Sequence, residues 1–236
     1  MITIYPAHER YSANHGWLRS NFSFSFADYY DASNMSFGPM RVLNDDWIAQ
    51  ETGFGMHPHR EMEIVTLVLS GHLEHQDSLG NVAQTTWGGI QRMSAGTGIM
   101  HSEYNRSNDE PLELLQMWFT PNQTGLQPSY ETTAFDTDAL RNNLTLVVSG
   151  AEGDTNHPSV ASIAQDMSIY LSEPEAGHSI TYSQIAGRKI FLFVLEGSVS
   201  IEHTVLNRRD SARIEGEASM TVKAEESSRF MLIDLP

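Results

Sequence analysis

The chain contains no cysteine among its 236 residues. This absence excludes disulfide bonds, thiolate metal sites and cysteine nucleophiles. Imidazole and carboxylate groups are then the remaining strong protein ligands for a transition metal. Any metal chemistry must therefore be sought among the histidines and acidic residues.

Positive charge is also scarce, because 14 lysines and arginines face 30 acidic residues, for a formal net charge of −16. A nucleic-acid backbone would repel such a chain. The sequence also lacks the basic stripe that would attract an anionic lipid surface. We therefore expect neither direct nucleic-acid binding nor membrane binding.

Long hydrophobic runs are missing as well. No run approaches the ~18 apolar residues that a membrane span needs. The first 17 residues, MITIYPAHERYSANHGW, are polar and lack the apolar core of a signal peptide. Hydrophobic residues make up 40% and charged residues 19% of the chain, an ordinary globular balance. We expect a soluble, cytoplasmic protein.

What the chain does contain is a series of short apolar or alternating runs separated by turn residues. Many short strands with regular turn signals predict an all-β sandwich or barrel. Helical periodicity is weak, and only residues 136–143 are expected to form a short helix. The predicted strands cover residues 22–26, 63–70, 114–119, 144–149, 189–196, 198–203 and 230–235.

The two halves of the chain resemble one another. A segment with two prolines and one glycine, residues 120–133, predicts a division into domains 1–133 and 134–236. On either side of it, the motif Val-Leu-x-Gly occurs at 68–71 and 194–197, an offset of 126 positions. The match indicates either a repeated β unit or a chance similarity between two apolar strands.

Two histidines flank a proline at the start of one predicted strand. Pro58 disfavours helical geometry for His57 and suits the first residues of a strand. In a strand, His57 and His59 lie on one face, about 6.6 Å apart along the backbone. The pair could therefore present two imidazoles to one metal ion, although such pairs are often only exposed histidines.

A second pair has the same spacing. His101 and Glu103 follow a glycine-rich turn at residues 96–98. Together the pairs would form a site of three imidazoles and one carboxylate, suited to Fe(II), Mn, Co, Ni, Cu or Zn. His72 and His75 could be core, hairpin-surface or cavity residues, with a surface or structural role favoured. Surface positions are expected for the remaining histidines, His8, His15, His157, His178 and His203.

These segments carry a family resemblance. HPHREMEIVTLVLSGHLEHQDSLGN (57–81) and MSAGTGIMHSEYN (93–105) resemble the two signature motifs of the pirin family within the cupin superfamily. The likeness is greatest to bacterial pirin-like bicupins with quercetin 2,3-dioxygenase activity. The motifs depart from the general cupin pattern at three points, one of which is that the leading glycine of the second motif is displaced to Gly89. Seven residues rather than six separate Glu63 from Gly71, and Gly96 replaces a proline.

The resemblance implies a bicupin, with two cupin-type β-barrel domains packed together and one metal in the N-terminal barrel. It implies His57, His59, His101 and Glu103 as metal ligands. Glu63 would then line the barrel without coordinating. A shift of 126 positions replaces the ligands with Ser183, Ile185, Ser227 and Arg229. We therefore expect domain 134–236 to be a degenerate cupin without metal.

The resemblance also implies an activity. A bound divalent ion, with Fe(II) favoured, would keep an open position for a flavonol such as quercetin. Glu103 would act as the catalytic base, and O2 would open the ring with release of carbon monoxide. The alternatives are a regulatory pirin-like protein that binds a protein partner without turnover, and a purely structural metal site.

Overall fold

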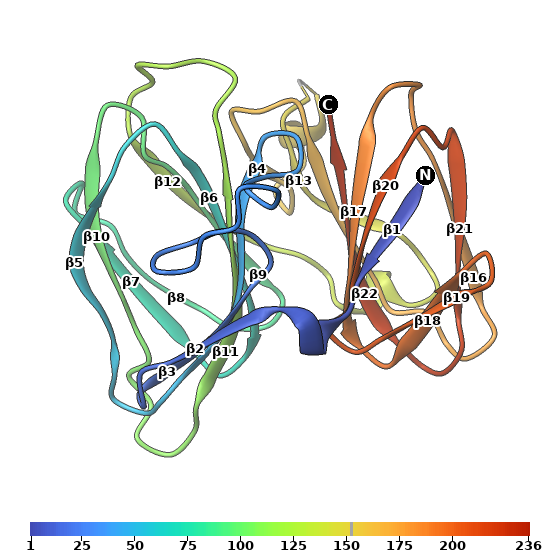
Figure 1. The fold of residues 1–236 in the computed structure, drawn as a ribbon. Coiled ribbons are helices and arrows are strands. Elements are labelled where there is room, and N and C mark those ends of the chain that lie inside the picture. Colours follow the sequence, from blue (N-terminus) through green and yellow to red (C-terminus); the bar gives the residue numbers. More distant parts are fainter. Residues whose placement is uncertain (152) are drawn as a thin grey trace. The chain divides into compact units, whose positions relative to one another are not determined.

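The computed structural model describes residues 1–151 and 153–236, and the chain divides into two compact units (Figure 1). The N-terminal unit comprises residues 11–135 and 157–165. The C-terminal unit comprises residues 1–10, 136–156 and 166–236. The predicted boundary after residue 133 lies close to the change of unit at 135/136. However, the first ten residues group with the C-terminal unit, and residues 157–165 with the N-terminal one.

Both units are built from β-strands, so the all-β prediction with two domains is confirmed. The helices of the described residues are single 3-10 turns, η1 (Ala7–Glu9), η2 (Asp138–Leu140) and η3 (Asp154–Asn156). The helix expected over residues 136–143 is therefore wrong in extent, because only η2 forms there. No helix in the described ranges is long and apolar enough to span a bilayer.

The N-terminal unit contains two sheets. The larger sheet has the strand order β12-β9-β6-β11-β4-β3-β2, and the smaller has the order β5-β10-β7-β8. The strands are β2 (Tyr11–Asn14), β3 (Leu18–Phe22), β4 (Met40–Ile48), β5 (Gly53–His59), β6 (Glu63–Ser70), β7 (Leu73–Asp77), β8 (Val82–Thr85), β9 (Gly89–Ser94), β10 (Ile99–Tyr104), β11 (Leu112–Phe119), β12 (Ser129–Ala134) and β14 (Ala161–Ser162).

The C-terminal unit repeats this topology. Its larger sheet runs in the order β1-β20-β17-β22-β15-β13, and its smaller sheet has the order β16-β21-β18-β19. Strand β1 pairs with β20 at the edge of this sheet, as β12 pairs with β9 in the N-terminal unit. The edge strand therefore comes from the start of the chain in the C-terminal unit and from residues 129–134 in the N-terminal unit. The strands are β1 (Ile2–Tyr5), β13 (Thr145–Ser149), β15 (Ser168–Ser172), β16 (Ser179–Ser183), β17 (Lys189–Glu196), β18 (Ser198–Ile201), β19 (Thr204–Asn207), β20 (Ser211–Glu215), β21 (Ser219–Ala224) and β22 (Arg229–Leu235).

The Val-Leu-x-Gly repeat marks the same place in both units. It ends β6 in one and β17 in the other, and these strands occupy equivalent positions in their sheets. Gly71 and Gly197 then adopt φ values of +78° and +73°. A Cβ atom would lie 2.6 Å from Pro111 O at the first glycine and 2.6 Å from Ser228 Oγ at the second. Both turns thus need glycine, and the similarity reflects repeated structure.

The interiors of the two units differ in polarity. One apolar cluster occupies the C-terminal unit, drawn from β16 to β22 and including Leu192, Val199 and Phe230. The N-terminal unit instead buries histidines, carboxylates and amides together with its apolar residues. Chemistry is therefore to be sought in the N-terminal unit.

One predicted strand is wrong. The alternating phenylalanines at 22–26 do not continue β3, which ends at Phe22. Ala27 adopts a φ of +49°, and Phe26 forms an isolated bridge with Tyr29. The Phe26 ring turns back onto Phe22, with ring centroids 5.2 Å apart. The alternation therefore reflects packing of a folded-back loop rather than a strand.

Candidate metal centre

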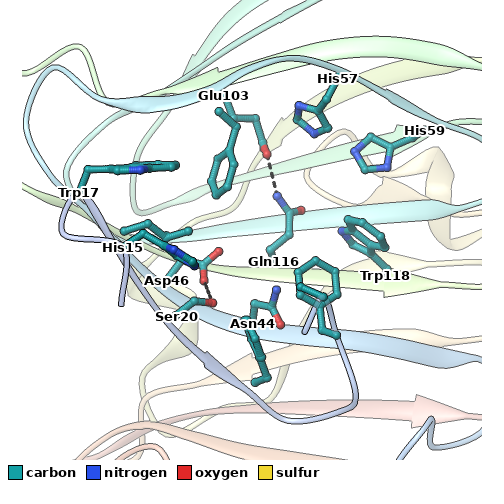
Figure 2. A pocket seen from close by; sticks show the side chains of 15 residues that line it. His15, Trp17, Ser20, Asn44, Asp46, His57, His59, Glu103, Gln116 and Trp118 are labelled. Carbon is teal, nitrogen blue, oxygen red and sulfur yellow. Dashed lines mark hydrogen bonds between the residues drawn. The ribbon is translucent and has the colours of Figure 1, made fainter. Parts of the chain in front are cut away.

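Three histidines meet on the smaller sheet of the N-terminal unit, and Figure 2 shows two of them, His57 and His59. His57 and His59 lie on β5, and His101 lies on the neighbouring strand β10, directly opposite His57. Their ligand nitrogens all lie within 4.8 Å of one another. Within the described residues, these are the histidines and acids that approach closely enough to share one ion. The spacing of two residues thus places both imidazoles of β5 on the same face, as predicted.

Hydrogen bonds define the tautomers of two of these rings. His57 Nδ1–H donates to Gly55 O at 2.8 Å, which leaves His57 Nε2 without a proton. On the far side of His101, its Nδ1 lies 3.4 Å from His75 Nδ1, and His75 Nε2 lies 3.0 Å from Asp77 Oδ2. The Asp77 carboxylate can only accept, so His75 keeps its proton on Nε2. His75 Nδ1 then accepts from His101 Nδ1–H, which leaves His101 Nε2 without a proton.

The two bare nitrogens face each other. His101 Nε2 lies 3.0 Å from His57 Nε2. Two lone pairs at this distance repel unless a proton or a cation lies between them. Imidazole nitrogens bind a transition metal at about 2.0–2.1 Å, so two ligands at a right angle lie about 2.9 Å apart. The pair thus fits a metal ion of this size.

Burial also favours the neutral form of two of the rings, His59 and His101. Burial lowers the pKa of His101 to about 2, and its histidine neighbours add to the effect. Burial and the nearby His57 lower the pKa of His59 to about 4. Neutral imidazole is the form that binds metal, because protonation occupies the lone pair. His59 and His101 are therefore in the metal-binding form at neutral pH.

The sequence favours a surface or structural position for His75 and leaves a cavity position open; in the structure His75 is a buried partner of His101. Its side chain is buried and stacks on the Tyr130 ring at 4.0 Å between centroids. His75 and Asp77 are spaced by two residues like the other pairs, but this spacing does not show that they meet His101. By contrast, His72 is exposed, and its Nδ1 lies 3.3 Å from Glu110 Oε1.

Glu103 lies two residues after His101 and lines the same cavity as His57 and His59. Its Oε2 accepts a hydrogen bond from Gln116 Nε2 at 2.8 Å, and Gln116 Oε1 accepts one from Thr66 Oγ1 at 3.0 Å. Burial raises the pKa of Glu103 to about 7, although these neighbours lower it. Glu103 is absent from the group of close ligand atoms, so its role as fourth ligand stays a prediction.

The lining role expected for Glu63 is wrong. Its neighbours Ile64 and Thr66 line a small cavity beside His101, and alternation along β6 turns Glu63 to the opposite face. There Glu63 Oε2 accepts hydrogen bonds from Ser94 Oγ at 2.8 Å and from Ala164 N at 3.1 Å. Glu63 therefore connects residues 157–165 by a hydrogen bond to the larger sheet of their own unit.

The cavity beside the histidines has a volume of about 450 Å³, within the usual range for small-molecule sites. Its walls are largely aromatic, and several buried polar groups lie among the rings (Figure 2). The space suits a planar, largely apolar ligand. The lining residues are His15, Trp17, Leu18, Ser20, Phe22, Phe26, Ala27, Asn44, Asp46, Phe54, His57, His59, Glu103, Gln116 and Trp118.

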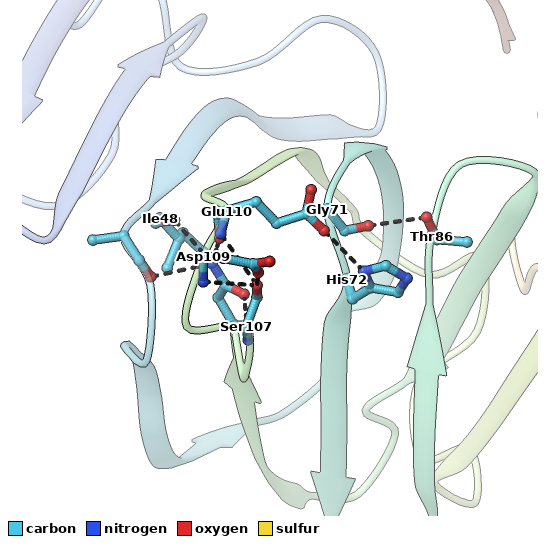
Figure 3. A network of polar contacts seen from close by, with 9 residues as sticks. Ile48, Gly71, His72, Thr86, Ser107, Asp109 and Glu110 are labelled. Atoms are coloured by element: carbon cyan, nitrogen blue, oxygen red, sulfur yellow. Dashed lines mark hydrogen bonds and ion pairs between the residues drawn. The ribbon is translucent and has the colours of Figure 1, made fainter.

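A polar network anchors the end of β10, which carries His101 and Glu103 (Figure 3). The buried Asn105 donates its side-chain amide to the carbonyls of Ile48 and Glu110, at 3.4 and 2.9 Å. Its own Oδ1 accepts from Ser107 N at 3.0 Å. This asparagine therefore fixes the loop that follows the strand, and with it the position of the site.

Known proteins share this architecture. A family model described as Pirin matches residues 6–119, and one described as the quercetinase C-terminal cupin domain matches residues 146–235. A relative from Escherichia coli K12 named quercetin 2,3-dioxygenase is 42% identical, covering 100% of this chain and 99% of the relative. A pirin-like protein from Caulobacter vibrioides is 38% identical and covers 99% of each chain.

A solved structure is similar over the whole chain. The bacterial pirin YhhW from Escherichia coli, solved in complex with nickel(II), superposes with a TM-score of 0.93. Its sequence is 41% identical, and the match covers 100% of this chain and 99% of that chain. The two-domain cupin architecture is therefore shared with a protein known to hold a divalent metal.

Proposed function

Because the chain belongs to the pirin family, we propose that it is a metal-dependent dioxygenase acting on a flavonol such as quercetin. The reaction would consume O2, open the central ring and release carbon monoxide. The observation that carries the proposal is the pair of unprotonated nitrogens, His57 Nε2 and His101 Nε2, facing each other at 3.0 Å beside an aromatic cavity. Relatives named quercetin 2,3-dioxygenase support the choice of substrate.

The proposed metal ligands are His57, His59, His101 and Glu103, and Fe(II) is the ion that we favour. Three imidazoles and a carboxylate leave one or two positions open, as in catalytic rather than structural sites. When bound, the metal supplies a Lewis acid that lowers the pKa of a substrate hydroxyl. The nickel complex of YhhW supports a divalent ion.

The protein's own groups would orient the substrate and take up its proton. Trp17, Phe54 and Trp118 would hold the flat ring system and exclude water. The carboxylate of Glu103, which lines the cavity, is the base that we propose for the substrate hydroxyl. The amide of Gln116 holds that carboxylate at 2.8 Å and so orients it toward the cavity.

Turnover of quercetin tests the proposal directly. Protein loaded with Fe(II) is expected to bleach the long-wavelength absorption band of quercetin in air and to release carbon monoxide. The rate should fall to background without O2 and after chelation of the metal. A fully metallated protein that turns over no flavonol would overturn the enzymatic proposal. The regulatory alternative would then be tested by a pull-down for a protein partner.

The Asp77→Asn variant is expected to bind metal about 10- to 100-fold more weakly, the usual effect of a change in the hydrogen bonds that orient a metal-ligating histidine, here transmitted to His101 through His75. An asparagine amide can donate to His75 Nε2, which would move the His75 proton to Nδ1. Two N–H groups would then face each other at His75 Nδ1 and His101 Nδ1. This contact favours the other tautomer of His101, in which the proton lies on Nε2, the atom that faces His57.

Metal affinity measured by competition with a chelator checks this effect. Glu74→Gln on the same strand is the matched control, because Glu74 pairs with Arg106 outside the cavity. Thermal melting confirms that both variants fold. Equal metal affinity in Asp77→Asn and the wild type would show that Asp77 does not act through His101.

A further inference from the structure

A group of buried polar side chains lies across the cavity from the histidines (Figure 2). Ser20 on β3 and Asp46 on β4 are direct partners in the sheet register, and the Ser20 hydroxyl donates to the Asp46 carboxylate. Asn44 lies two residues before Asp46 and therefore shares its face of β4. All three side chains are at least 95% buried and line the cavity. We call them the Ser20–Asn44–Asp46 group.

Among the described residues, one atom of this group has no hydrogen-bond partner. The side-chain oxygen of Asn44 is buried and accepts no hydrogen bond from the described residues. Leaving a buried acceptor unpaired is unfavourable, and native structures do so rarely. Asn44 lies between Phe22 and Gln116 in the sheet register, so its side chain belongs to the cavity face. The unpaired oxygen thus belongs to a side chain that lines the cavity.

The chemistry of the group selects a ligand. Asn44 Oδ1 can only accept a hydrogen bond, so the ligand must offer a hydrogen-bond donor to it. Burial raises the pKa of Asp46 to about 7, with smaller contributions from Asp45 and Glu103. A phenolic hydroxyl suits Asp46 in either state, because it can donate to a carboxylate or accept from a carboxylic acid. The aromatic walls add a preference for a flat ring.

We propose that the Ser20–Asn44–Asp46 group binds hydroxyl groups on the part of the substrate that lies away from the metal, which makes the site specific for polyhydroxylated aromatics. This inference rests on the proposed function for the orientation of the ligand. The metal end would bind the hydroxyl and carbonyl oxygens at which the reaction begins. The Ser20–Asn44–Asp46 group would distinguish flavonols by their remaining hydroxyls.

Binding under anaerobic conditions separates recognition from turnover. Two probes share the 3-hydroxyl and the neighbouring carbonyl, namely quercetin and 3-hydroxyflavone, but only quercetin carries further ring hydroxyls. Wild-type protein loaded with metal is expected to bind quercetin at least about 10-fold more tightly, because 3-hydroxyflavone leaves the buried acceptors unpaired. Titration followed by the flavonol absorption band measures both affinities.

The Asn44→Leu variant removes the unpaired acceptor and keeps the number and branching of the side-chain heavy atoms. It should lose about 10-fold in quercetin affinity and bind 3-hydroxyflavone within about twofold of wild type. Asp46→Asn, which preserves shape, should also weaken quercetin selectively. Asp45→Asn is the matched control, because alternation along β4 turns Asp45 to the opposite face of the strand. The two-probe comparison in the wild type keeps the test decisive even if Asn44→Leu fails to fold.

Equal affinity of the wild type for the two probes would overturn the inference. A preference for quercetin that survives in folded Asn44→Leu and Asp46→Asn would also overturn it. These outcomes are independent of turnover. Selective binding of quercetin without turnover would support this recognition role and refute the dioxygenase. Turnover without selective binding would support the dioxygenase and refute the recognition role.

Discussion

The His59→Ala variant is expected to lose most of its bound metal, with an affinity more than about 100-fold below that of wild type, and to lose dioxygenase activity with it. Removing a direct ligand should exceed the 10- to 100-fold effect of removing an outer partner. His59 contacts Trp118 edge-on at 4.8 Å between ring centroids and is only half-buried. Its loss should therefore disturb the metal more than the fold. Elemental analysis after dialysis measures the effect.

His72→Ala is the matched control. His72 lies on the same unit and is also a histidine, but its exposed ring pairs with Glu110 outside the cluster. Its removal should leave the metal content and activity at wild-type levels. Full metal occupancy in His59→Ala would refute the proposed ligand set.

The Glu103→Gln variant is expected to lose at least about 10²-fold in kcat, the lower end of a general-base contribution. Glutamine keeps the shape and an oxygen that can accept from Gln116, but it has neither negative charge nor basicity at neutral pH. The comparison requires metal-loaded protein, so metal content is measured on the same preparation. Quercetin consumption and release of carbon monoxide then report the rate.

Glu63→Gln provides a matched control for this substitution. Glu63 is another buried carboxylate of the same unit, but it faces away from the cavity and binds Ser94 and Ala164. The kcat of Glu63→Gln should stay within about threefold of wild type, because no proton of the reaction passes through Glu63. Full activity in metal-loaded Glu103→Gln would limit Glu103 to a role as ligand.

The sequence by itself determined the class of the fold and the central histidines. The run at 63–70 coincides with β6, and the equivalent run at 189–196 coincides with β17. His57 and His59 could be assigned to one face because alternation along a strand is a local property. The resemblance to pirins, which the comparisons confirm, rests on the same local motifs.

Tertiary structure alone decided how distant strands contribute to the site. His75 became the partner of His101 because β7 pairs with β10 across 26 positions of sequence, a register that no local pattern encodes. The same holds for Asn44, which faces the cavity because β3, β4 and β11 lie side by side. Glu63 points outward because the cavity lies on the Thr66 side of β6. Local spacing determines which side chains share a face of a strand, but the packing of the sheets determines what that face meets.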